Sequence, residues 1–102
     1  STTLKSVQIR GSIKSLSNGA YQNCTSLTDV SLNTSITNIG TYAFSGCSSL
    51  PSIIIPDLVR AVNVYSFQNC TSLTSVYIGS SVTLVDQYAF SGCSKLPNIT
   101  RL

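Results

Sequence analysis

The chain has 102 residues, of which 42% are hydrophobic and only 9% are charged, and its formal net charge at pH 7 is +3. This hydrophobic content excludes the low-hydrophobicity, high-charge profile of a disordered chain. The six basic residues are scattered instead of forming the dense stripe that binds nucleic acid, and no apolar run reaches the roughly 18 residues of a membrane span, so we expect neither partner for this segment.

A repeat of 23 residues runs through the sequence. The heptapeptide YAFSGCS begins at Tyr42 and returns unchanged at Tyr88, and looser copies surround Cys24 and Cys70. Self-similarity at this period is the signature of a solenoid, in which each repeat stacks on the next. We therefore expect residues 1–102 to form one solenoid domain, with coils 2–24, 25–47, 48–70 and 71–93 and a partial coil 94–102.

Each coil is expected to open with a short strand. After the leucine of the repeat, two apolar residues stand one position apart, and this alternation is typical of a half-buried strand. The expected strands are 7–9, 30–32, 53–55 and 76–78. A turn follows, and then a second extended segment with two inward residues, at 13–16, 36–39, 59–62 and 82–85.

The coil is expected to close through an aromatic segment. A small residue there precedes a ring, as Ala43 precedes Phe44. We predict one helical or 3₁₀ turn that buries the ring, because 3₁₀ pieces are short. Stacked coils then place equivalent strands about 4.8 Å apart as a parallel sheet with ladders of side chains.

A single coil cannot bury enough apolar surface to fold alone, so neighbouring coils must supply the stability. We see no polar capping coil at either end, and the sequence starts with Ser1 in place of Met. We expect the chain to come from a longer array or to associate end to end with itself. The coils also alternate between two forms, since QNCTSLT occurs at 22–28 and 68–74 and the other coils contain SGCS. This alternation indicates duplication of a two-coil unit.

The pattern LxxVxI, a turn, VxxI and YAFxxC closely resembles the BspA-type leucine-rich repeats of bacterial and protist surface proteins, over essentially the whole chain. Coil one departs from it by holding Gly19 where the other coils have Tyr42, Tyr65 and Tyr88. The resemblance implies a β-rich leucine-rich-repeat solenoid of the α/β type, a right-handed stack with a parallel sheet on one side. It also implies display on a cell surface or secretion, and binding of host, extracellular-matrix or other-cell proteins.

Nothing in the sequence indicates an enzyme, a metal site or a cofactor. Histidine is absent, and the carboxylates Asp29, Asp57 and Asp86 occupy different places in their coils, so no acid–base or nucleophilic group can be named. Equivalent cysteines should form a straight ladder with parallel Cβ directions, whereas a disulfide or a zinc site needs converging ligands. We therefore expect buried structural thiols.

The candidate binding residues lie on the outward side of the first strands. The middle residue of each strand must point out of the stack, and these positions are Gln8, Ser31, Ile54, Tyr77 and Thr100. Ile54 and Tyr77 are adjacent and apolar, which is typical of interface anchors, although packing across the ladder would also explain them. The tyrosine column at Tyr42, Tyr65 and Tyr88 offers the same two interpretations, and four sequons make Asn23, Asn33, Asn69 and Asn98 candidate glycosylation sites.

Three functions remain open from the sequence. The first is a non-catalytic protein-binding module of an adhesin, which depends on the resemblance because fold alone does not give function. The second is a spacer or stalk that holds another domain away from a surface. The third is an intracellular scaffold repeat, which thiols without disulfides would permit.

Overall fold

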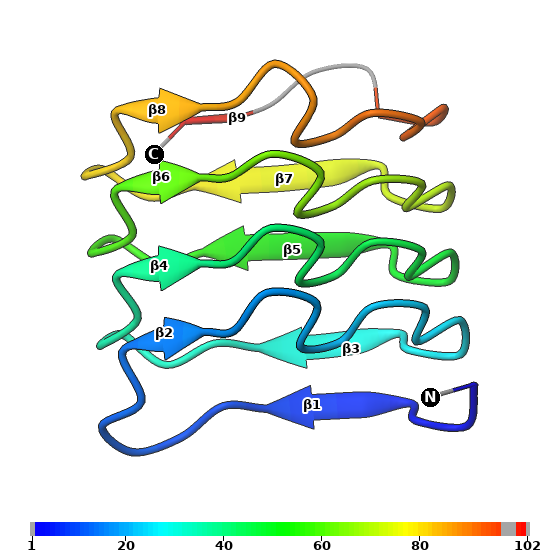
Figure 1. The fold of residues 1–102 in the computed structure, drawn as a ribbon, viewed down its shortest axis with the longest axis horizontal. Coiled ribbons are helices and arrows are strands. Elements are labelled where there is room, and N and C mark those ends of the chain that lie inside the picture. Colours follow the sequence, from blue (N-terminus) through cyan, green and yellow to red (C-terminus); the bar gives the residue numbers. More distant parts are fainter. Residues whose placement is uncertain (1, 97–99, 102) are drawn as a thin grey trace.

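The computed structural model describes residues 2–96, 100 and 101. The chain winds into a solenoid whose coils stack one above another, with a first and a second strand on opposite sides of each coil (Figure 1). The first strands are β1 (Ser6–Gln8), β3 (Asp29–Ser31), β5 (Ser52–Ile55), β7 (Ser75–Ile78) and β9 (Thr100–Arg101). The second strands are β2 (Ser15–Leu16), β4 (Asn38–Ile39), β6 (Ala61–Val62) and β8 (Leu84–Val85).

Every strand pairing is parallel and joins residues that are equivalent in the repeat. Val7 pairs with Val30 in β1 and β3, and Leu16 pairs with Ile39 in β2 and β4. Register is strongly specified here because a slip by one residue would turn the apolar set outward. The 23-residue period therefore predicted both the solenoid and its register correctly.

The second strands form one continuous sheet, β2-β4-β6-β8, but the first strands are divided into the sheets β1-β3 and β5-β7-β9. Pro51 accounts for the division. Thr28 and Thr74 donate their backbone N–H to the carbonyl oxygens of Lys5 and Pro51 one coil earlier, at 2.9 Å each. Pro51 occupies the equivalent position in coil three and has no N–H to donate, so this bond cannot form between coils two and three.

The core is a set of vertical columns. Leu27, Leu50 and Leu73 are fully buried above one another. The rings of Phe44 and Phe67 are also fully buried and stack with centroids 5.3 Å apart and an interplanar angle of 7°. Each coil thus completes the core of its neighbours, as expected for a repeat protein.

The predicted helical or 3₁₀ turn at the aromatic segment is wrong. In the described part of the chain this segment is a run of turns without helix of either kind. In coil two, the N–H groups of Ala43, Ser45 and Cys47 donate to carbonyls three residues earlier. The intervening N–H groups of Phe44 and Gly46 donate instead to Ser66 and Gln68 of coil three, at 2.7 Å each. A 3₁₀ helix would use every donor within its own coil, whereas here half of them join neighbouring coils.

Two columns of the aromatic segment contain residues with a left-handed backbone. The residue before each cysteine has a positive φ, namely Asn23 (60°), Gly46 (79°), Asn69 (59°) and Gly92 (80°). Asparagine and glycine are the residues that tolerate this conformation best. The position of Gly19 (67°), Tyr42 (59°) and Tyr65 (57°) is also left-handed, which explains why coil one accepts a glycine there.

Candidate interaction surface

The outward positions of the first strands form two separate pairs. Gln8 pairs with Ser31 across β1 and β3, and Ile54 pairs with Tyr77 across β5 and β7. Thr100 continues the second pair through β9. Ser31 and Ile54 are not joined, because their strands belong to different sheets. The structure therefore assembles the predicted column in two halves.

Ile54 and Tyr77 are the apolar members of this surface. Their neighbours Ile53, Ile55 and Val76 point inward and are at most 2% exposed, whereas Ile54 is 62% and Tyr77 39% exposed. The alternation follows from the pleat of β5 and β7. A large aliphatic side chain and an aromatic one therefore stand side by side in solvent.

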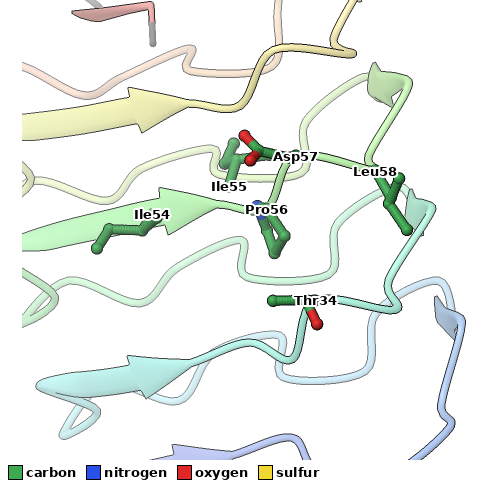
Figure 2. Close-up of a pocket in the computed structure, with 6 residues that line it drawn as sticks. All are labelled: Thr34, Ile54, Ile55, Pro56, Asp57 and Leu58. Carbon is green, nitrogen blue, oxygen red and sulfur yellow. The ribbon is translucent and has the colours of Figure 1, made fainter.

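A hollow of about 460 Å³ adjoins Ile54 at the turn after β5. Its lining consists of Thr34 from coil two and Ile54, Ile55, Pro56, Asp57 and Leu58 from coil three (Figure 2). Leu58 is 52% exposed, and the backbone N–H of Ser80 donates to Oδ1 of Asp57 at 3.2 Å. The sequence-based prediction did not include Thr34, Asp57 or Leu58. Aligning the coils gives one signal: Ser12, Ser35 and Ser81 occupy the position of Leu58.

The cysteine column is built from buried thiols. Cys24, Cys47 and Cys70 are buried, Cys93 is half-buried, and none of these four described cysteines is in a disulfide. The Sγ atoms of Cys47, Cys70 and Cys93 donate to the carbonyl oxygens of Tyr21, Phe44 and Phe67 at 3.3, 3.2 and 3.1 Å. Burial raises the pKa of Cys47 to about 11. The hydrogen bond with Cys93, together with burial, also raises the pKa of Cys70. Both thiols are therefore protonated and poorly nucleophilic at neutral pH.

The sequon asparagines have structural partners. Asn33 donates from Nδ2 to the carbonyl oxygen of Ile13 at 3.3 Å and accepts the N–H of Ser35 at 2.7 Å. Asn23 and Asn69 place Oδ1 against the glycine of the next coil, where a Cβ on Gly46 or Gly92 would lie 2.4 or 2.1 Å away. Asn98 lies outside the described residues. Glycosylation of the four sequons remains a prediction.

The tyrosines form a column at the surface. The ring centroids of Tyr42 and Tyr65 are 5.2 Å apart, and those of Tyr65 and Tyr88 are 5.9 Å apart. Tyr42 and Tyr88 are exposed and Tyr65 is half-buried. Because each ring lies against the next, mutual packing accounts for the column without a ligand.

Parallel coils around a leucine column, with a solvent-facing strand surface, define a leucine-rich-repeat solenoid. Residues 1–101 match the model of the BspA type Leucine rich repeat region (6 copies), and the chain belongs to this family. The family and its fold are generally non-catalytic. The fold subtype is thus the one that the sequence motifs indicated.

Two solved structures are similar to the chain. A leucine-rich repeat protein from Bacteroides ovatus has 35% sequence identity and a TM-score of 0.89 over 96% of this chain. A leucine rich cell surface protein from Faecalibacterium prausnitzii has 28% identity and a TM-score of 0.70 over 94% of it. The chain spans 25% of the first of these proteins and 31% of the second. A comparison with curated proteins found no match.

Neither a membrane span nor a metal-binding cluster appears in the residues that the structure describes. Within 2–96 and 100–101, no helix has the length and apolar character needed to cross a bilayer. The same residues contain no group of three or more His, Cys, Asp or Glu side chains that could hold a metal ion.

Proposed function

We propose that the chain is a non-catalytic protein-binding module of a cell-surface or secreted protein, and that it contacts a host, extracellular-matrix or other-cell protein. The observation that carries this proposal is the exposed pair Ile54 and Tyr77, held in register on adjacent strands. Family membership and the similarity to a leucine rich cell surface protein support the location. A module of this kind needs no catalytic group, because its function lies in its exposed side chains.

The free energy of burying Ile54 and Tyr77 against a partner favours binding over leaving these side chains in solvent. Burying an isoleucine side chain is worth roughly 1.5–3 kcal/mol, and large aromatic residues are enriched among the side chains that dominate binding energy. Ile54 and Tyr77 supply this area on paired strands, so their backbone is already ordered before binding. Gln8 and Ser31 form a polar continuation across the interruption between the sheets.

The test measures binding of the purified chain to immobilised extracellular-matrix proteins by biolayer interferometry. We expect the double variant Ile54→Ser/Tyr77→Ser to keep the far-UV spectrum of the wild type and to lose binding by about tenfold or more. Leu84→Ser is the matched control, because Leu84 is 58% exposed on the second-strand side of the stack. Absence of binding, or equal binding by the double variant and wild type, would favour a spacer role instead.

A further inference from the structure

Coil three differs from the other coils at the hollow in a coordinated way. At the positions of Asp57 and Leu58, the other described coils hold only glycine, threonine or serine: Gly11, Thr34 and Ser80; Ser12, Ser35 and Ser81. The repeat acts as an internal control, since the same turn forms in each coil without a large apolar side chain. The fold therefore does not require Leu58, which is 52% exposed.

The hollow has an apolar interior and one charged group. Ile54, Pro56 and Leu58 surround it, and Thr34 lies opposite Pro56 on the neighbouring coil (Figure 2). Its volume of about 460 Å³ falls within the range of roughly 300–1,000 Å³ that is usual for ligand sites. Asp57 is the one ionisable residue among the six that line it.

The carboxylate of Asp57 is held on the side of the hollow that faces coil four. Oδ1 accepts the backbone N–H of Ser80 at 3.2 Å, and no ion pair to this carboxylate occurs in the described part of the chain. A hydrogen bond from a backbone amide fixes the carboxylate without neutralising it. Asp57 is also exposed, so its negative charge is available to a cation that approaches the rim of the hollow.

We propose that this hollow binds a segment of the partner protein in which a large apolar side chain stands next to a lysine or arginine. The apolar side chain fills the space between Thr34 and Leu58, and the cation pairs with Asp57. This inference rests on the proposed function and adds the chemistry of the partner. The occupant is favoured by the combination of apolar walls with a single negative charge, since an acidic segment would be repelled by Asp57.

The experiment uses the ¹⁵N-labelled chain and two probes, N-acetyl-Phe-Arg amide and N-acetyl-Phe-Glu amide, titrated to millimolar concentration. We expect the Arg probe to shift the amide signals of 34, 54 and 57–58, and the Glu probe to bind more weakly. Asp57→Asn keeps the Oδ1 acceptor for Ser80 and should reduce the preference for Arg by up to about fivefold. Leu58→Ser, which introduces the residue of the other coils, should weaken the binding of both probes, and Leu84→Ser should change neither.

The outcomes separate this inference from the proposed function. Signal shifts elsewhere, equal binding of both probes to the wild type, or equal behaviour of Leu58→Ser and Leu84→Ser would overturn the inference. Binding of whole proteins depends on Ile54 and Tyr77 in the proposed function, so it would survive that result. Conversely, if Asp57→Asn removes the Arg preference but no matrix protein binds, the hollow is still a site for an apolar side chain next to a cation, and the proposed binding of matrix proteins is wrong.

Discussion

Replacing Gly46 with alanine tests how consecutive coils fit together. Gly46 has a φ of 79°, and a Cβ built on it would lie 2.4 Å from Oδ1 and 3.3 Å from Cα of Asn23 in the preceding coil. A left-handed backbone costs a residue with a side chain roughly 1–2 kcal/mol. Overpacking of a filled space costs about 1–3 kcal/mol more. We therefore expect Gly46→Ala to lower the free energy of unfolding by about 2–5 kcal/mol, a large part of the stability of a small domain.

Gly11 provides a matched control for the cost of placing a side chain on a left-handed backbone. Its φ is also 79°, but a Cβ there would meet nothing within 4 Å. Gly11→Ala should therefore cost only the roughly 1–2 kcal/mol of the backbone conformation. The background Asn23→Gly removes the clashing amide and should reduce the cost of Gly46→Ala to a similar value.

The assay is urea denaturation followed by far-UV circular dichroism, with each variant analysed in a double-mutant cycle. The coupling energy between Asn23 and Gly46 should be about 1–3 kcal/mol. The reasoning is refuted if Gly46→Ala and Gly11→Ala are equally destabilising, or if Asn23→Gly does not lessen the effect of Gly46→Ala.

Three further predictions concern the other columns. Phe67→Ala should lower the free energy of unfolding by about 3–5 kcal/mol in the same assay, because the ring is fully buried between two stacked rings. Leu84→Ala, on the surface, is the control and should change the free energy of unfolding by less than about 0.5 kcal/mol. Tyr65 has a φ of 57°, so Tyr65→Gly should be more stable than Tyr65→Ala by about 1 kcal/mol, and a lower denaturation midpoint for the glycine variant would contradict this reasoning. Burial raises the pKa of Cys47 from 9.0 to about 11, so its stabilising contribution is complete below pH 9 and is lost as the pH rises toward 11, where the unfolded thiol has already released its proton. Denaturation midpoints measured from pH 8 to 10.5 should fall less in Cys47→Ala than in the wild type, and equal slopes would count against this contribution.

The sequence predicted those features that depend on one coil and its repetition. The alternation around Ile54 defines which residues face inward, and the period aligns them, so strands, register and the buried rings all followed from the pattern. The exposure of Ile54 and Tyr77 followed for the same reason. These features do not depend on how residues at non-equivalent positions of the repeat contact one another.

The features that were missed depend on which atoms of neighbouring coils meet, which the pattern of one coil does not show. The run of turns arises because Phe44 and Gly46 donate to the next coil, which no single-coil pattern reveals. The division of the first-strand sheet arises from Pro51, whose missing N–H matters only once its partner is known. The hollow joins Thr34 to residues twenty or more positions later, so it became visible only when coils two and three were placed together.

The alternation of Asn and Gly before the cysteines has a steric meaning beyond gene duplication. Asn23 and Asn69 fill the space against the next coil, and that coil must then hold Gly46 or Gly92, because any Cβ would collide with the amide. A coil with asparagine therefore requires a coil with glycine above it, which fixes the order of the two forms. The turn at Leu58 is under no such requirement, since three other coils form it with serine. Substitutions at the positions before the cysteines therefore destabilise the stack, whereas the turn at Leu58 tolerates different side chains. A binding site in this stack is accordingly best sought where coil three differs from its neighbours.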